Sequence, residues 1–494
     1  MGVREATRRL LDRFPAALAR AGVVERGPAT EAFDLAVPVM VTGGLRVLLR
    51  MADFVFVGLA IGDTAIAALE LAFLYYFVAF GLSLALTSGT ISVVSRLQGA
   101  NERRRADLAL KQSLWLVVAL SVPLSAVAWL YPEWLVGLLS ADAAVVALGA
   151  AYLRVVMLSL LFRFWSMAAA RALAGSGDTR TPMYVRLLTL PTNVALNAVL
   201  VFGLGPAPRL GVVGVAIGTV VANTLAGVVF FALLVSGRYS VSLRLGGPQF
   251  DAALTREIVR VSAPLTGMRL LQSSVRFPFL FVLGTLGTPV VAAYAIGRRV
   301  MLLALMPAWG YSTAASTLVG QAVGAGDEAG ATEYGWQTLR IGLATQLLLA
   351  VVLVAAARPI ATLFGTDHAG LAVEFIRVFG LATAGFSLSR TMRGSLRGAG
   401  DTRWPLYGTL LGSYAVRLPV AALALPAGTA VTVAGLSVTP GLGLGTTAVF
   451  LAILGDFYTK AAVNTGRFYS GSWQAVARAA GVGAGDTVGE AGDR

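Results

Sequence analysis

The sequence has no cysteine, a single histidine (His368) and few charged residues, which make up 13% of its 494 positions. The lack of cysteine excludes disulfides, thiolate metal sites and cysteine nucleophiles. One histidine cannot form a histidine-based metal cluster. Lysine is also scarce, since arginine supplies every basic residue except Lys111 and Lys460. We interpret this preference as a compositional bias and infer no function from it.

Clustered catalytic groups are missing as well. An integral-membrane enzyme needs several carboxylates or histidines gathered at one membrane face. No Asp-x-x-Asp-like or histidine-rich spacing of that kind occurs. No pattern indicates a nucleotide, zinc or haem site. The sequence therefore predicts a protein that is not an enzyme and has no cofactor.

Hydrophobic residues, in contrast, make up 57% of the chain, more than is usual for soluble domains. They gather in long runs, and about 20 apolar residues are enough to cross a bilayer as a helix. The pattern predicts an all-α integral membrane protein with twelve transmembrane helices in two six-helix bundles. The expected spans are 32–58, 66–97, 108–131, 144–173, 183–204, 211–235, 258–287, 290–322, 335–357, 371–396, 405–426 and 442–464.

An internal repeat relates the two halves. Gly175-Ser-Gly-Asp-Thr-Arg-Thr-Pro182 returns 223 residues later (401 − 178) as Gly398-Ala-Gly-Asp-Thr-Arg-Trp-Pro405, and Pro38 recurs as Pro264. Each copy predicts a tight corner, in which the second glycine closes one helix, the aspartate or threonine caps the next, and the proline lies in its first turn. Six spans in each half keep the halves in one orientation, so they are parallel repeats.

The net charge of +14 does not indicate nucleic-acid binding, because the arginines gather in short segments between apolar runs. Such segments mark the cytoplasmic side of a membrane protein. The arginine-rich loops follow spans two, four, six and ten, whereas the alternate loops are nearly bare. Both termini are therefore predicted to be cytoplasmic in a multi-pass protein of the cell (plasma) membrane.

The same pattern gives a domain organisation. Residues 1–30 form a cytoplasmic N-terminal arm, and residues 467–494 form a cytoplasmic tail. The six-helix bundles occupy 31–236 and 257–466, and a cytoplasmic linker loop at 237–256 joins them. A monomer is the default expectation.

Asp53 is the most informative charge, because an isolated charge in hydrocarbon is costly and usually functional. It lies in the first span, and Arg46 and Arg50 precede it at a spacing that places all three on one helical face. One interpretation is a buried Arg–Asp pair that merely neutralises itself. The other, which we favour, is a carboxylate that takes up and releases a cation or proton.

Polar residues in the fifth and sixth spans extend this picture. Asn193 and Asn197 lie four residues apart, just after Pro191, which frees a backbone carbonyl. Carboxylate, amide and backbone oxygens suit a hard monovalent cation such as Na⁺. Hydrogen bonding between helices explains the two amides equally well. Thr219 and Asn223 in the sixth span offer a further polar face with the same ambiguity.

A polar stripe follows Pro264 in the second half. It comprises Arg269, Gln272 and Arg276. We expect Gln272 and Arg276, together with Asn223, to line a substrate cavity. Asp456, in the last span, is either a second buried carboxylate or a residue near the cytoplasmic end of its helix.

These features together resemble the multidrug and toxic compound extrusion (MATE) transporters, and their DinF-like and archaeal branch more than their NorM-like branch. The resemblance covers about residues 31–478. It rests on the twelve spans, the repeated Gly-x-Gly-Asp-Thr-Arg-x-Pro corner, the first span from Pro38 to Asp53, and the stretch from Asn193 to Thr219. It implies two six-helix bundles that alternate between outward- and inward-facing states. It also implies export of amphipathic organic cations by antiport against Na⁺ or H⁺.

Residue by residue, the resemblance implies that Asp53 is the cation or proton site, with Asn193 as its companion amide and Thr219 as a hydroxyl ligand. Two departures matter. The DinF-like branch commonly has an aspartate where this chain has Asn197, and the NorM-like branch commonly has a glutamate where Gln272 stands. The second half is therefore not expected to hold an ion site of its own. Coupling then rests on Na⁺ at Asp53, Asn193 and Asn197, or on protonation of Asp53.

A flippase for lipid-linked oligosaccharides, from the same wider superfamily, is the alternative. A flippase of this kind would favour an arginine-rich cavity that binds pyrophosphate. This alternative stays open because the second half contains suitable arginines, namely Arg269, Arg276, Arg298 and Arg299. A multisubstrate exporter should instead have an apolar cavity lined by phenylalanine and methionine. The expected partners are small amphipathic cations and membrane lipids, without nucleic acid.

Overall fold

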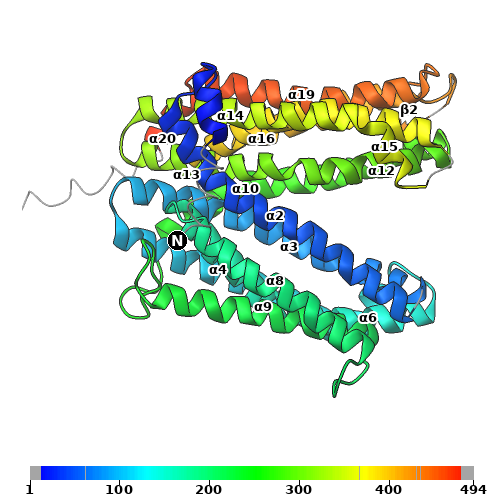
Figure 1. Cartoon of the computed structure of the whole chain (residues 1–494), viewed down its shortest axis with the longest axis horizontal. Helices are drawn as coiled ribbons and strands as arrows, with labels where there is room; N and C mark the ends of the chain where they lie inside the picture. The colour runs from blue at the N-terminus through cyan, green and yellow to red at the C-terminus, as the bar shows by residue number, and fades with distance from the viewer. Residues whose placement is uncertain (1–12, 62, 366–367, 430, 434–435, 480–494) are drawn as a thin grey trace, which may run out of the picture. The chain divides into compact units, whose positions relative to one another are not determined.

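The structure is a computed structural model of the whole chain (Figure 1), and it describes residues 13–61, 63–365, 368–429, 431–433 and 436–479. Almost all of this part of the chain is helical. Loops connect the helices, and the two described strands form a hairpin in which β1 (Val431–Val433) pairs antiparallel with β2 (Leu436–Val438). The predicted all-α membrane fold is confirmed.

Eight of the predicted spans are single helices. These are α2 (Arg26–Ile61), α3 (Asp63–Gly99), α4 (Arg103–Leu130), α8 (Arg180–Phe202), α9 (Gly211–Val235), α14 (Glu328–Ala355), α16 (Ala369–Gly398) and α19 (Gly445–Tyr469). With 37 residues, α3 exceeds the length that about 30 Å of hydrocarbon requires.

The other four spans are interrupted helices. α6 (Ala143–Leu158) meets α7 (Leu160–Gly175) at 45°, and α12 (Thr288–Ala304) meets α13 (Met306–Gly324) at 43°. α10 (Ala252–Ser274) leads into α11 (Arg276–Thr285). α17 (Arg403–Thr409) continues through the π-helix η1 (Leu410–Arg417) into α18 (Leu418–Ala422). Three short helices complete the order: α5 (Pro132–Gly137), α15 (Ala357–Thr362) and α20 (Trp473–Ala479).

Seven single helices in the described part of the chain are long and apolar enough to cross a membrane, or nine spans if each bent pair counts as one. The remaining crossings of the twelve-helix fold are α2, α10 with α11, and α17 with α18. The segments of the last group are each too short to cross alone, since a crossing takes about 20 residues.

Both copies of the repeated corner have the predicted glycine and proline geometry, and only the first copy has the predicted cap. Gly177 and Gly400 have φ values of 95° and 85°, the left-handed region that glycine adopts most readily. The next helix begins three residues later in each case, at the first residue of α8 or α17, and the proline lies in its first turn. The repeat is therefore a structural device that closes one helix and starts another.

The aspartates of the two corners have different partners. Asp178 Oδ1 accepts the Thr181 N–H at 2.9 Å and so caps α8. Asp401 instead accepts from Arg467 Nε at 2.7 Å. Burial raises the pKa of the Asp401 carboxyl, and its effect is larger than the lowering by Arg467. One repeated residue thus stabilises a helix start in one half and an ion pair in the other.

The described chain forms two compact units, and the boundaries between them fall at Pro38 and Pro264. Residues 38–263 make up the N-terminal unit, and residues up to 37 together with those from 264 make up the C-terminal unit. Both prolines lie inside helices, so α2 and α10 each contribute to both units. The two prolines of the repeat therefore mark equivalent points, at which the chain passes from one unit to the other.

Local contacts hold each helix start in its unit. Ser262 in α10 donates to the Leu86 carbonyl at 2.7 Å and accepts the Gly89 N–H at 3.1 Å, both within the N-terminal unit. The Tyr334 hydroxyl donates to Glu31 at the start of α2 at 2.8 Å, within the C-terminal unit. The first turns of α2 thus pack with helices that lie some 300 residues later in the chain.

A loop at 237–251 packs on α4; the sequence assigns the linker to 237–256, but the last five of those residues belong to α10. Lys111 Nζ donates to the carbonyls of Gly246 and Pro248 at 2.8 and 3.1 Å. Asp107 accepts from the Arg244 guanidinium at 2.8 Å. These buried charges on α4 therefore have structural partners. The assignment of this loop as a cytoplasmic linker stays a prediction.

Candidate functional site

Helices α8 and α9 of the N-terminal unit approach each other closely because glycines lie at their contact. A Cβ atom on Gly214 would lie 2.8 Å from the Leu200 carbonyl, and one on Gly218 would lie 2.1 Å from Asn197 Oδ1. Small residues at such contacts let helix backbones come together in membranes. Asn197 is fully buried in this contact.

Three of the predicted site residues lie together there. Asn193 Nδ2 donates to Asn197 Oδ1 at 3.4 Å and to Thr219 Oγ1 at 3.3 Å. Asn197 Nδ2 donates back to Asn193 Oδ1 at 3.5 Å. These distances are long for hydrogen bonds, so the three side chains have weak mutual contacts. Asp53 lies in α2, but its side chain is outside the described residues.

A cavity of about 100 Å³ lies beside this cluster in the N-terminal unit. Asn193, Thr219 and Asn223 line it, as do polar residues that the sequence analysis did not select. The full lining is Arg46, Leu69, Phe73, Tyr76, Tyr152, Arg163, Arg186, Thr189, Leu190, Asn193, Val215, Thr219, Ala222 and Asn223. Asn223 is held in the wall by donating to Ser159 Oγ at 3.1 Å and to the Tyr76 hydroxyl at 3.4 Å.

The unexpected feature of this cavity is its three arginines. Arg163 and Arg186 are only 8% and 6% exposed. Arg46 lines the same cavity as both of them. The Arg163 guanidinium lies over the Phe80 ring at 5.3 Å. The cavity wall is therefore strongly basic over the residues that the structure describes.

The sequence carried a signal for these arginines. Arg163 and Arg186 fall inside the predicted spans 144–173 and 183–204, and a charge within a span is functional more often than not. Neither arginine was among the predicted site residues, because Asp53 and the neighbouring amides were the polar groups selected in the first half. The structure places both arginines in the wall of this cavity.

The side chains that the structure describes here, which do not include Asp53, fit Na⁺ poorly. Asn193, Asn197 and Thr219 offer three neutral oxygen ligands, but three guanidinium groups line the adjoining cavity. A metal cation would experience their Coulomb repulsion in a medium that screens it weakly. Among the described residues, no group of three or more His, Cys, Asp or Glu is placed to hold a metal ion.

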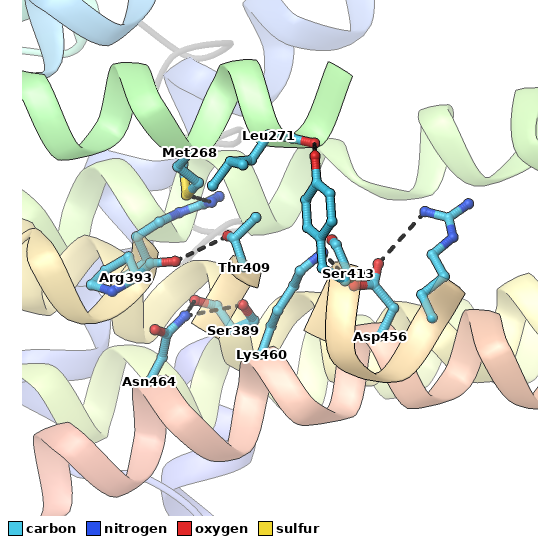
Figure 2. Close-up of polar contacts among 12 residues, drawn as sticks. Met268, Leu271, Ser389, Arg393, Thr409, Ser413, Asp456, Lys460 and Asn464 are labelled. Carbon is cyan, nitrogen blue, oxygen red and sulfur yellow. Dashed lines mark hydrogen bonds and ion pairs between the residues drawn. The ribbon is translucent and has the colours of Figure 1, made fainter. Parts of the chain in front are cut away.

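The C-terminal unit contains a buried charged network around Asp456 (Figure 2). Asp456 is 1% exposed, near the middle of α19. It lies 2.6 Å from Lys460 Nζ and 3.6 Å from the Arg417 guanidinium, and it accepts from Ser413 Oγ at 3.0 Å. The carboxylate is therefore deep in the unit and not at a helix end.

Two features of this network set it apart from a simple ion pair. Ser413 and Arg417 belong to η1, and π-helical segments often occur at functional sites. Arg393 is a further cation, 8% exposed, whose Nη1 contacts Met268 Sδ at 3.2 Å. Asp456 thus faces more than one positive charge in the interior of the unit.

Gln272 and Arg276 are not among the described residues that line the cavity of the N-terminal unit. Gln272 is half-buried in α10, and Arg276 is exposed at the first turn of α11. Both belong to the C-terminal unit. The cavity to which Asn223 contributes therefore does not include the other two residues that were expected to line it.

Twelve membrane helices in two repeat-related units, each with polar groups buried inside it, are the architecture of a secondary transporter. The family model MatE matches residues 38–199 and 264–423, one segment in each half. The chain therefore belongs to the MatE family, as the sequence resemblance predicted.

Named relatives cover most of the chain. A probable multidrug resistance protein NorM of Bradyrhizobium diazoefficiens is 28% identical over 402 residues, which are 79% of this chain and 85% of that protein. A probable multidrug resistance protein NorM of Thermotoga maritima is 26% identical over 451 residues, 90% of this chain and 93% of that protein. The predicted preference for the DinF-like branch gains no support from these names.

A crystal structure described as MATE in the bent conformation has the same fold. It superimposes with a TM-score of 0.82 and covers 92% of this chain and 97% of its own. The sequences are 21% identical, so the likeness concerns the fold alone.

Proposed function

We propose that this protein is a secondary active multidrug exporter. It moves amphipathic organic compounds, expected to be cations, out of the cell by antiport against Na⁺ or H⁺. The observation that carries the proposal is the match of both halves to one transporter family. The names of the relatives, which refer to multidrug resistance, support the substrate class.

Coupling is assigned to Asp53, together with Asn193, Asn197 and Thr219. Antiport requires only that the ion and the substrate bind differently to the two conformations of the transporter. Of the two ions, the arginines of the adjoining cavity favour H⁺, because a proton neutralises a carboxylate without needing a ligand shell beside guanidinium groups. A proton that reaches Asp53 from outside would lower the affinity for the substrate, which then leaves outward. Release of the proton to the inside would complete the cycle.

The proposal includes a topology and a state of assembly. The transporter is placed in the plasma membrane as a monomer with both termini in the cytoplasm, because the arginine-rich loops lie on one side. A DinF-like relationship also stays part of the proposal. It rests on the first-span carboxylate Asp53 and on the absence of a glutamate at Gln272.

The lipid-linked oligosaccharide flippase remains the competing function. The relatives named above do not favour it, although the basic cavity is a property that it would share. An exporter and a flippase differ in what they move, so transport of a soluble dye separates them.

The test is efflux of a fluorescent cationic dye from proteoliposomes, with a Na⁺ gradient and a pH gradient imposed separately. We expect the pH gradient to drive export, and Asp53→Asn to abolish coupled transport while the protein remains folded. Normal efflux by Asp53→Asn would refute the assigned role of this carboxylate. No dye movement by folded wild-type protein under either gradient would favour the flippase.

A further inference from the structure

The cavity of the N-terminal unit has more positive than negative charge. Its described lining contains three arginines and no carboxylate. Among the residues of this unit whose side chains are not described, only Asp53 and Asp63 are acidic. The three arginines of the lining therefore outnumber these two carboxylates.

Two hydrogen-bond donors in the cavity wall are also unused within the described part of the chain. The Nε of Arg163 and the hydroxyl of Thr189 are buried and have no hydrogen-bond partner. Thr189 is 3% exposed and Arg163 8%. Buried charges are normally paired, because removing them from water is costly. A wall of this kind is incomplete without a group that accepts hydrogen bonds and carries negative charge.

The remaining lining shows what such a group would be attached to. Leu69, Phe73, Leu190 and Val215 form apolar wall in the same cavity. Guanidinium groups bind carboxylates and phosphates through charge-assisted, often paired hydrogen bonds. The combination of a basic wall and an apolar wall suits an anionic group on a small amphipathic molecule.

We propose that this cavity is an anion-binding site that takes the carboxylate or phosphate group of an amphipathic compound, with Arg163 and Arg186 as its principal ligands. The inference deepens the proposed function, on which its role in transport rests, because it extends the substrates to acidic and zwitterionic compounds. The same chemistry is found in a soluble metabolite or drug and in the headgroup of an anionic lipid.

The experiment is calorimetric titration of phenyl phosphate into the full-length protein in detergent. Benzyl alcohol and benzylamine serve as neutral and cationic compounds of similar size. We expect phenyl phosphate to bind at least about tenfold more tightly than either, since two to three charge-assisted hydrogen bonds distinguish them. Equal binding of the three compounds, or no binding of phenyl phosphate, would overturn the proposal.

Variants locate the binding. Arg186→Gln and Arg163→Gln should each weaken phenyl phosphate binding about tenfold or more, whereas Arg186→Lys should retain part of it because the charge remains. Arg238→Gln changes an exposed arginine of the same unit and should leave binding unchanged. If Arg186→Gln does not fold, as judged by circular dichroism, the affinity of Arg163→Gln for phenyl phosphate tests the site instead. Unchanged affinity in a folded cavity variant counts against the site.

Lipid competition identifies the source of the anion. If phosphatidylglycerol displaces phenyl phosphate and phosphatidylcholine does not, the site binds a lipid headgroup. If neither lipid displaces it, the site binds a soluble compound. Both results support an anion site. Dye efflux with no phenyl phosphate binding would refute only this inference, whereas phenyl phosphate binding without any transport would refute only the export function.

Discussion

At the scale of single residues, Asp456 is a buried carboxylate that neutralises more than one buried cation. It is the described partner of Lys460 at 2.6 Å and of Arg417 at 3.6 Å, and all three side chains are largely buried. Arg417 also lies over the Phe279 ring at 3.8 Å. Phe279 stands where the repeat would place the counterpart of Asp53, so the second half uses an aromatic ring at that position.

The first prediction concerns this network. Asp456→Asn leaves Lys460 and Arg417 buried without their counter-charge, which should destabilise the protein by about 3–5 kcal/mol. Thermal unfolding in detergent, followed by circular dichroism, would show this as a lower midpoint. The double variant Asp456→Asn/Lys460→Met is the control, since it removes one cation together with the carboxylate. It should be less destabilised than the single variant, and a double variant at least as unstable would contradict the argument.

At the scale of helices, the close contact of α8 and α9 depends on glycine. The second prediction is that Gly218→Ala destabilises the N-terminal unit by about 1–3 kcal/mol, the usual range for overpacking. The added Cβ would lie 2.1 Å from Asn197 Oδ1 and 3.1 Å from the Asn197 backbone nitrogen. The Asn197 side chain must therefore move, and its hydrogen bonds with Asn193 should be lost as well.

A matched control is available in the same unit. Gly81 lies in α3, and a Cβ added there would meet nothing within 4 Å. Gly81→Ala should be neutral or slightly stabilising, because alanine favours helix more than glycine does. If both variants unfolded at the same temperature as the wild type, the proposed tight contact of α8 and α9 would be wrong.

The helix breaks have different causes. α13 begins one residue before Pro307, and proline removes a backbone donor and disrupts the preceding turn. The break between α6 and α7 has no proline or glycine. It falls at Ser159, whose hydroxyl donates to the Val156 carbonyl at 2.7 Å and accepts from Asn223. A side chain that bonds to its own helix competes with the helical ladder, so this bend depends on tertiary contacts.

At the scale of the whole molecule, the sequence makes a topological prediction that its lack of cysteine renders easy to test. Arg238→Cys places the only thiol in an arginine-rich loop, and Ala141→Cys places it in a loop on the opposite predicted face; both positions are exposed. In intact cells, a membrane-impermeant maleimide should label Ala141→Cys but label Arg238→Cys only after permeabilisation. The reverse pattern would invert the proposed orientation and place both termini outside.

The sequence alone determined the class of protein, the helices and the repeat. Apolar runs need no tertiary partner to be recognised, because the bilayer imposes their length, and the glycine and proline of each corner specify local backbone geometry. The grouping of Asn193 with Asn197 also followed from helical spacing.

Only the tertiary structure decided what surrounds those amides. Arg46, Arg163 and Arg186 come from three different helices, and their convergence on one cavity depends on how those helices pack. The units likewise divide inside helices, at Pro38 and Pro264, where the sequence pattern is continuous. Spacing along the chain reports which side chains share a helix face, whereas the electrostatics of a buried site arise from charges far apart in sequence, and only packing brings those together.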